Sequence, residues 1–268
     1  MQPDWAPAEL DLSRPNAARV YDYYLGGAHN FAVDRQMAQQ AIELWPDVPK
    51  IIAANRTFLR RAVHCLVDAG IDQFLDLGSG IPTVGNVHEV AQGVDPGARV
   101  VYVDIDPVAV AHAQAILAGN PHVQAIRADL RKPDDVLARP EVAQVLDLSR
   151  PVAVLMVAVF HFVPDGDRPG DIIAAYRDAV PSGSHLAFSH ATADGQRPEQ
   201  AEQHQRLYSR TPTPMIMRTH AEISAFLDGW DLLEPGLVRL PLWRPGDEDV
   251  LPEDPETFAG YAAVARKP

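Results

Sequence analysis

The chain has 268 residues, of which 47% are hydrophobic, and a formal net charge of −13 at pH 7. This length allows one large domain with extensions or two small ones, and the apolar fraction suffices for a full core. Because a uniformly acidic surface repels phosphate backbones and anionic lipids, the charge argues against nucleic-acid and membrane partners.

Single residue types narrow the class of protein further. Cys65 is the only cysteine, which excludes an internal disulfide and a Cys-rich zinc site. The histidines lack HExxH-type spacing, so no metal is expected. The N-terminus lacks the basic and apolar regions of a secretory signal, and the apolar run 152–160 is about half of the ~20 residues that cross a bilayer. We therefore expect a cytoplasmic protein.

The first predicted elements are helices. They cover residues 16–25, 34–44 and 48–69, after a loose tail over residues 1–12. Ser13 is the expected N-cap of the first helix and Asp34 that of the second. The third helix carries an apolar stripe at 3.6-residue spacing. Asn55 lies on that stripe, where a buried amide needs a hydrogen-bond partner.

From residue 71, short apolar runs alternate with helical segments. The expected strands cover residues 73–77, 99–104, 122–127, 152–160, 184–190, 230–240 and 258–265. The expected helices cover residues 84–92, 107–117, 133–147 (broken), 169–180, 198–209 and 219–227. This alternation predicts an α/β fold, a doubly wound, Rossmann-like, seven-stranded and mostly parallel sheet. Residues 1–70 form an N-terminal helical lid on it, and residues 71–268 form one compact domain.

Two of these strands end beside a carboxylate. Residues 74–80 read FLDLGSG, and residues 100–107 read VVYVDIDP. Gly78 and Gly80 allow the backbone to approach a ligand closely because they have no Cβ. Asp104 follows at roughly the 20-residue offset at which an acidic side chain reaches a ribose diol. The sequence thus predicts a nucleotide-like ligand at the carboxyl edge of the sheet.

An ordered set of motifs resembles the class I S-adenosylmethionine-dependent methyltransferases. The set is DLGSG, VDID, IRADL and VPSGS before LAFSH. The segments SRPNAARVYDYYLGGAHNFAVDR and ANRTFLRRAV are further similar to a bacterial group named simply S-adenosyl methyltransferase, once a domain of unknown function. The resemblance implies that residues 71–268 bind S-adenosylmethionine, and that the methyl group goes to a small-molecule acceptor.

The resemblance also implies roles for single residues. Asp76 would lie near the methionyl ammonium of the cofactor, although it could instead cap the following turn. Asp104 would bind the ribose, and Ile105 would lie against the adenine face. Asp129 and the Leu130 amide would bind the adenine edge. The complete set of expected cofactor residues is Tyr21, Arg56, Asp76, Gly78, Ser79, Gly80, Asp104, Ile105, Asp129, Leu130 and Val159.

The segment 158–162 follows the fourth strand, where this family faces the transferred methyl group. It reads AVFHF, which lacks the (D/N)PP(Y/F) pattern of enzymes that methylate bases or glutamine and is more similar to the LHH-type sequence of small-molecule enzymes. His161 is therefore the candidate general base, with a structural histidine as the alternative. The expected substrate residues are Tyr24, His29, Asn30, His190, Tyr208 and Met215.

Two other functions stay open at this stage. A non-catalytic regulator that binds S-adenosylmethionine would keep the glycine loop and Asp104 but need no reactive His161. An NAD-dependent oxidoreductase would use the same kind of sheet, but Thr83 stands in place of the third glycine of GxGxxG. The sequence indicates neither the acceptor and the methylated atom nor the oligomeric state.

Overall fold

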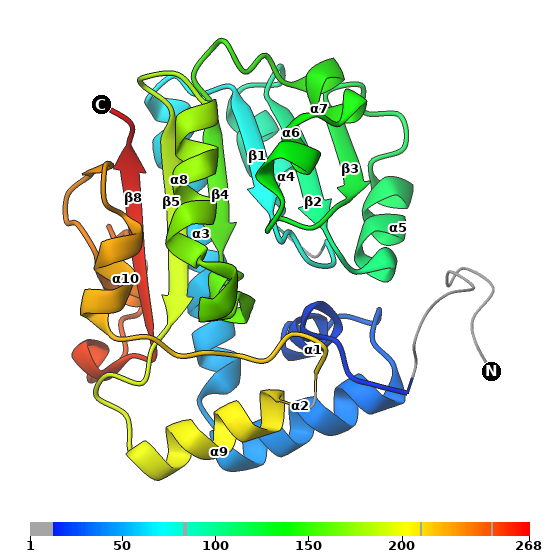
Figure 1. Ribbon diagram of the computed structural model, residues 1–268. Helices are drawn as coiled ribbons and strands as arrows, with labels where there is room; N and C mark the ends of the chain where they lie inside the picture. Colours follow the sequence, from blue (N-terminus) through cyan, green and yellow to red (C-terminus); the bar gives the residue numbers. More distant parts are fainter. Residues whose placement is uncertain (1–12, 83–84, 210, 248) are drawn as a thin grey trace.

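The computed structural model describes residues 13–82, 85–209, 211–247 and 249–268. The tail predicted over residues 1–12 and the predicted helix start at residue 84 lie outside this part of the chain. A central sheet runs through the molecule in the order β3-β2-β1-β4-β5-β8-β6, and β7 also pairs with β8 (Figure 1). The path of seven strands and its mostly parallel pairing confirm the predicted doubly wound fold.

The strands are short and begin near the predicted positions. They are β1 (Gln73–Leu77), β2 (Arg99–Asp104), β3 (Val123–Arg127), β4 (Ala153–Val157), β5 (His185–Ala191), β6 (Asp231–Leu232), β7 (Val238–Arg239) and β8 (Gly260–Arg266). Strands β1 to β5 pair in parallel, whereas β8 runs antiparallel to β5. The strand expected over 230–240 is in fact two two-residue strands, because a turn separates β6 from β7.

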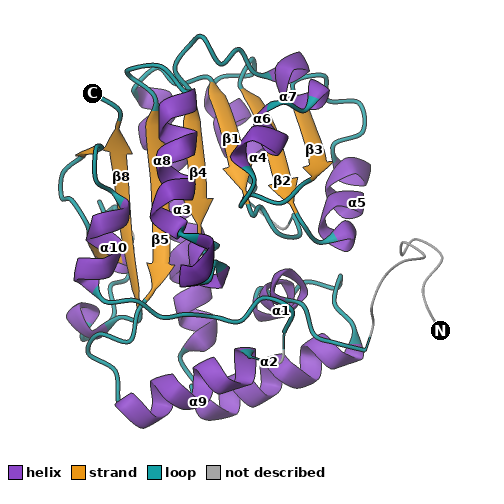
Figure 2. Ribbon diagram, viewed as in Figure 1, coloured by secondary structure: helices purple, strands orange, loops and turns teal. Residues whose placement is uncertain are grey.

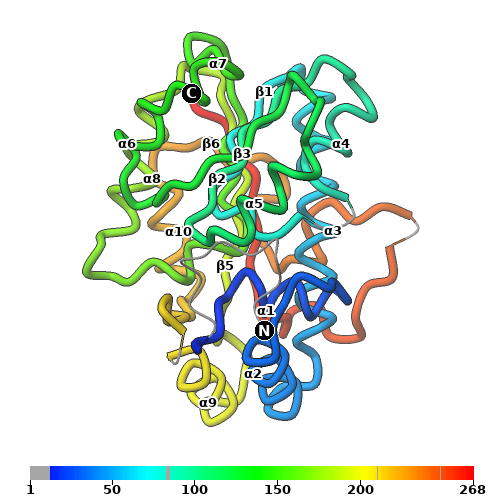
Figure 3. Tube along the Cα trace, turned by 90° about the vertical axis from the view of Figure 1, so that its right-hand side faces the viewer, coloured from blue at the N-terminus to red at the C-terminus, as the bar shows by residue number. Residues whose placement is uncertain are grey.

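Helices cover both faces of the sheet and its lower end (Figure 2). They are α1 (Ala17–Tyr24), α2 (Ala32–Leu44), α3 (Val48–Asp68), α4 (Val87–Val94), α5 (Pro107–Ile116), α6 (Pro133–Leu137), α7 (Pro140–Val145), α8 (Pro169–Ala179), α9 (Pro198–Tyr208) and α10 (His220–Phe226). Seen from the β3 edge, α6, α7, α8 and α10 lie on one side of the sheet, and α3 and α4 on the other (Figure 3). No helix in the described part of the chain is long and apolar enough to cross a membrane.

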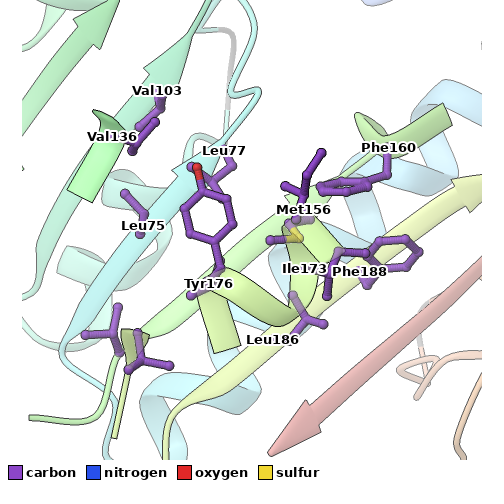
Figure 4. Close-up of a cluster of buried hydrophobic side chains, with 14 of the residues drawn as sticks. Leu75, Leu77, Val103, Val136, Met156, Phe160, Ile173, Tyr176, Leu186 and Phe188 are labelled. Carbon is purple, nitrogen blue, oxygen red and sulfur yellow. The ribbon is translucent and has the colours of Figure 1, made fainter. Parts of the chain in front are cut away.

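The core divides into two layers because successive strand residues point to opposite faces. Leu75 and Leu77 of β1 belong to the cluster that includes Tyr176 of α8 (Figure 4). Phe74, one position before Leu75, points to the other face and belongs to the opposite cluster with Phe58 of α3. Burial on both faces explains why these strands are continuous apolar runs in the sequence.

The predicted caps of the first two helices are wrong. The N-cap of α1 is Asn16, whose side-chain oxygen accepts a hydrogen bond from the Ala18 N–H at 2.8 Å. Asp34 is the third residue of α2, and its carboxylate accepts the N–H groups of Phe31 and Asn16, each at 2.9 Å. One buried carboxylate thus stabilises both helix starts. Its bond to Phe31 is local, whereas its bond to Asn16 spans 18 positions and is not encoded by local sequence.

The predicted lid lies beyond the carboxyl ends of the parallel strands, where α1 and α2 meet α9 (Figure 1). Val20, Met37, Ala41 and Leu207 form a small separate core between these three helices. Helix α3 instead packs on the sheet itself. The division of the chain at residue 70 stays a prediction.

Candidate active site

A cleft opens at the carboxyl ends of the central strands, where the strand order reverses between β1 and its neighbours β2 and β4. This switch point is the usual ligand site of doubly wound sheets. The walls come from the loops after the strands and from α1 and α3. Every predicted cofactor residue lines this cleft: Tyr21, Arg56, Asp76, Gly78, Ser79, Gly80, Asp104, Ile105, Asp129, Leu130 and Val159. Their individual roles stay predictions.

The two glycines of the first loop have different surroundings. Both have left-handed backbones, with φ of +74° at Gly78 and +68° at Gly80. A Cβ built on Gly78 would lie 2.2 Å from Cγ2 of Val159, so this residue must be glycine for packing. A Cβ on Gly80 would meet no atom within 4 Å, because it would point into open space. Gly80 lines the cleft, and its Cα is not packed against other atoms of the chain.

Asp104 ends β2 and holds the glycine loop. Its Oδ2 accepts the Gly80 N–H at 2.7 Å, and its Oδ1 accepts the Asp106 N–H at 2.8 Å. The side chain is buried, and burial raises its pKa to about 6 despite these two hydrogen bonds. Each carboxylate oxygen has a second lone-pair direction, so both remain able to accept hydrogen bonds from a pair of ligand hydroxyls.

Asp76 and Arg56 place opposite charges in the same cleft. Burial raises the pKa of Asp76 to about 7, an effect that the Arg56 guanidinium opposes and the Asp104 carboxylate enhances. The Nη2 of Arg56 donates to the Gly85 carbonyl at 3.1 Å. A zwitterionic ligand end would therefore find a carboxylate and a guanidinium together here.

Asp129 has a partner that the sequence analysis missed. Arg131 donates from Nη2 to Asp129 Oδ2 at 2.7 Å and from Nε to Oδ1 at 2.9 Å. Burial alone would raise the pKa of Asp129, but these hydrogen bonds outweigh burial and hold it below its usual value. Both side chains line the cleft, so any contact from Asp129 to a ligand is shared with Arg131.

A second cavity adjoins the cleft on the side of α9. The residues Ala17, Tyr21, Asn55, Ala158 and Phe162 line both spaces. His161, His190, Tyr208 and Met215 line only the second cavity, as do parts of α3 and β5. The predicted base and half of the predicted substrate residues are therefore brought together beside the cleft.

The other predicted substrate residues line neither space. The Tyr24 hydroxyl lies 3.3 Å from that of Tyr208. The His29 ring contacts the ring of His112, with 3.9 Å between their centroids. Asn30 donates from Nδ2 to the Asp22 carboxylate at 2.8 Å. A direct contact of His29 or Asn30 with a substrate stays an untested prediction that this arrangement does not favour.

Asn55 lies where the cleft and the second cavity meet, and its buried amide has the hydrogen-bond partners that the sequence analysis expects. Its Nδ2 donates to the Tyr21 hydroxyl at 2.9 Å, and its Oδ1 accepts from the Ser189 hydroxyl at 2.6 Å. The Ser189 Oγ in turn accepts the Ala158 N–H at 2.9 Å. This chain of hydrogen bonds fixes the Tyr21 ring between cleft and cavity. The sequence predicts no role for Ser189, whereas Ala158 belongs to the segment predicted to face the transferred methyl group.

His190 has both ring nitrogens engaged. Its Nδ1 lies 2.7 Å from the Ala191 carbonyl and must donate, so its Nε2 accepts from Arg218 at 2.9 Å. Burial lowers its pKa to about 4. His190 can therefore contribute a ring surface to the cavity but no free hydrogen-bonding group.

His161 is buried, and burial, reinforced by His190 and Arg218, holds its pKa well below the usual value. Its Nδ1 accepts the Ala191 N–H at 3.4 Å, a long contact. A neutral ring whose Nδ1 accepts carries its proton on Nε2. A base acting through Nε2 would need the other tautomer, in which the Nδ1–H would face the Ala191 N–H.

The raised pKa of Asp76 predicts a particular pH dependence of folding. The ordinary Asp pKa is 3.8, whereas the folded value is about 7. Between these values the folded state binds more protons than the unfolded state, so this group makes the free energy of unfolding fall as pH rises from about 4 to 7. Asp76→Asn should stabilise the ligand-free protein by about 2–4 kcal/mol at pH 8 and have almost no effect at pH 4.

Denaturant unfolding of both proteins across this range measures the difference directly. A difference that is constant with pH would show that Asp76 ionises normally. Asp147→Asn is the control, because Asp147 is exposed and hydrogen bonds from Ser149 lower its pKa.

Comparison with known proteins places this geometry in a family. Residues 3–268 match the family described as S-adenosyl methyltransferase. A DUF574 family protein from Streptomyces avermitilis MA-4680 superposes with a TM-score of 0.91 at 40% identity, over 96% of this chain and 99% of that one. A protein from Thermobifida fusca YX has a TM-score of 0.91 at 42% identity, over 99% of both chains. No curated protein matches the sequence.

More distant structures share the fold. The N-methyltransferase NodS from Bradyrhizobium japonicum WM9, solved with S-adenosyl-L-homocysteine, has a TM-score of 0.52 at 12% identity, over 93% of this chain and 99% of that one. The cleft itself fits an adenosine-bearing amino acid, since it offers an unpacked backbone at Gly80, the buried Asp76 carboxylate and the half-buried Arg56 guanidinium. The family match covers almost the whole chain. The chain therefore belongs to the S-adenosyl methyltransferase family and is an S-adenosylmethionine-dependent methyltransferase.

Proposed function

We propose that this methyltransferase acts on a small-molecule acceptor bound in the cavity beside the cofactor cleft. The observation that supports the proposal most is the shared wall, because Tyr21, Asn55, Ala158 and Phe162 border both spaces. The cavity holds about 680 Å³ of empty space when its open mouth is included, and its wall is mostly apolar and aromatic, as is usual for small-molecule sites. The protein's net charge of −13 disfavours a nucleic-acid acceptor.

In this proposal the protein mainly positions the reactants. When bound, S-adenosylmethionine supplies a methyl group on a positively charged sulfur. Asp104 and the Gly78–Gly80 loop hold the adenosine end, and Asp76 and Arg56 hold the amino-acid end. The Tyr21 ring, fixed by Asn55, borders the space where acceptor and cofactor meet. Such orientation lowers a barrier by on the order of 7–11 kcal/mol.

His161 is the group placed to hold or take the proton of the acceptor. Its low pKa keeps it neutral at pH 7, which is the form a general base requires. The His161→Ala variant should lower turnover by about 10²–10⁴-fold if the ring acts as a base. Its affinity for S-adenosylhomocysteine should stay within about threefold of wild type, because His161 does not line the cleft.

Turnover and calorimetry on the same preparations test this role. Full activity in His161→Ala would remove the base. A parallel loss of cofactor affinity and activity would instead indicate a structural histidine. His64→Ala, an exposed histidine on α3, is the matched control.

Release of S-adenosylhomocysteine tests the proposed function as a whole. Wild type is incubated with S-adenosylmethionine and a panel of small phenols, amines and acids, with Asp104→Ala as the binding-deficient control. The proposal expects release above background with at least one acceptor class. No release with any of them would favour a regulator that binds the cofactor without catalysis.

A further inference from the structure

Arg218 is a buried arginine in the segment between α9 and α10, and it is 4% exposed. Its guanidinium binds four acceptors. Nη1 donates to the Phe160 carbonyl at 3.2 Å and to His190 Nε2 at 2.9 Å. Nη2 donates to the Val163 carbonyl at 2.8 Å and to Asp165 Oδ1 at 2.6 Å. One side chain thus joins the turn that follows β4 to the end of β5.

The turn that Arg218 binds contributes to the walls of both spaces in the site. The side chains of Phe160 and Val163, at its two ends, belong to the core cluster that Figure 4 shows in part. Between them, His161 lines the second cavity, and Phe162 lines both the cleft and that cavity. A shift of this turn would therefore change the shape of both spaces.

The backbone of this segment needs contacts from outside to keep its shape. Ala158, two residues before the turn, has a left-handed backbone with φ of +57°, which is uncommon for a residue with a Cβ. Such strained conformations persist only where the surrounding structure holds them. The Ile216 N–H donates to the His161 carbonyl at 2.7 Å, and Arg218 binds the carbonyls at both ends of the turn. The segment before α10 thus holds the turn at three carbonyls.

Packing alone does not explain a charged side chain at position 218. A buried guanidinium loses its hydration, and hydrogen bonds to its N–H groups are needed to offset that cost. An apolar side chain of similar volume is often as stable in such a place, or more so. Asp165, the carboxylate that Arg218 binds, is exposed, so solvent screens its charge. The forked guanidinium differs from other side chains in binding several acceptors at once.

We propose that Arg218 is a positioning residue for cofactor binding: from outside the cleft, it holds residues 158–163 in the shape that completes the cleft wall. Val159, Phe162 and Val163 of this segment line the cleft, whereas the described walls of the cleft and of the second cavity do not include Arg218. Small displacements of binding groups are costly, so a loosened turn would weaken binding. The proposal concerns the established cofactor and holds whichever acceptor is methylated.

The Arg218→Met variant tests the proposal, because methionine keeps much of the side-chain length but has no forked donors. Its affinity for S-adenosylhomocysteine is measured by calorimetry, at a temperature where thermal unfolding shows the variant to be folded. We expect Kd to rise about tenfold over wild type. A wild-type Kd in the folded variant would overturn the proposal.

Arg239→Met is the matched control. Arg239 is 7% exposed and donates to the Phe258 carbonyl at 2.8 Å and to the Asp194 carbonyl at 3.1 Å. The guanidinium of each arginine also lies over an aromatic ring, at 5.1 Å from its centroid for Arg218 and 4.2 Å for Arg239. Because the residues described around the cleft do not include Arg239, Kd should stay within about threefold of wild type. An equal rise of Kd in both variants would reflect a general loss of stability and refute the positioning role.

Amide hydrogen exchange of the ligand-free protein shows whether the turn is the part that changes. The N–H groups of Phe162 and Val163 bond to carbonyls within the same segment, at 2.9 and 3.1 Å. In Arg218→Met, both should exchange at least about tenfold faster relative to Leu155, whose amide in the middle of β4 reports global unfolding. In Arg239→Met this ratio should not change. A higher Kd without faster exchange in the turn would mean that Arg218 does not act through it, contrary to the proposal.

Arg218→Lys retains the buried positive charge but replaces the fork by a single ammonium group. Because lysine cannot reproduce the fork, Kd should be at least about threefold above wild type. Full affinity in Arg218→Lys would show that the charge alone suffices and would contradict the role of the fork. If Arg218→Met does not fold, Arg218→Lys is compared with Arg239→Met in its place. If neither variant of Arg218 folds, the arginine is structural and the proposal is wrong.

Discussion

Gly78→Ala is expected to destabilise the folded protein by about 2–5 kcal/mol, whereas Gly80→Ala should cost only about 1 kcal/mol. Both residues have positive φ, so an alanine at either position has a strained left-handed backbone. Only at Gly78 does the new Cβ also collide with a side chain, 2.2 Å from Val159 Cγ2. The two substitutions are chemically identical and lie two positions apart, which makes each the control for the other.

For the affinity for S-adenosylhomocysteine we expect the opposite order, with the larger effect in Gly80→Ala. Gly80 lines the cleft, and if the Cβ of Gly80→Ala occupies the space of the bound cofactor, affinity for S-adenosylhomocysteine should fall by roughly tenfold or more in a well-folded protein. Denaturant unfolding measures the first effect and calorimetry the second. Equal stability of the two variants would show that Gly78 does not pack against Val159 as described. Wild-type affinity in Gly80→Ala would show that the ligand does not use this space.

Asp104→Ala should weaken binding of S-adenosylhomocysteine by about 1.5–3 kcal/mol, which corresponds to about 10–150-fold in Kd. The variant loses the acceptor atoms expected to bind the ribose hydroxyls. It also leaves the N–H groups of Gly80 and Asp106 without their acceptor, which loosens the glycine loop. Calorimetry on the purified variant gives the change directly.

Asp106→Ala provides the comparison for Asp104→Ala. Asp106 caps α5 by accepting the N–H groups of Val108 and Ala109 at 2.8 and 3.0 Å, and it does not line the cleft. Its loss should lower stability by about 0.5–2 kcal/mol and leave Kd within about threefold. Unchanged affinity in Asp104→Ala, or equal losses in both variants, would mean that the ribose assignment is wrong.

The cofactor cleft could be predicted from the sequence because its residues follow strands directly. Strand β1 ends just before Gly78 and Gly80, and β2 ends at Asp104, so the sheet itself determines where these residues lie. The ion pair of Asp129 with Arg131 was missed, although the two residues are close in sequence, because motif matching considers one carboxylate at a time. Local motifs thus predict where the cleft lies, but they do not predict that Arg131 binds the Asp129 carboxylate inside it.

The second cavity was harder to predict because distant segments build it. The sequence predicts His29 and Asn30 as substrate residues, but the Asp22 carboxylate accepts hydrogen bonds from the Asn30 amide and the His29 backbone N–H. His204, which lines this cavity, is a polar residue on the same buried stripe of α9 as Ala201 and Leu207. A polar residue on an apolar stripe identified Asn55 and would have identified His204.

The most direct test of the account is a crystal structure of the protein with S-adenosylhomocysteine bound. The account predicts the ligand at the carboxyl ends of β1 and β2, with the ribose hydroxyls on the Asp104 carboxylate and the adenosine passing over Gly80. Its sulfur should point toward the junction at Tyr21 and Phe162. Ligand density at any other place, or a cleft filled by atoms of the chain itself under saturating ligand, would contradict the account.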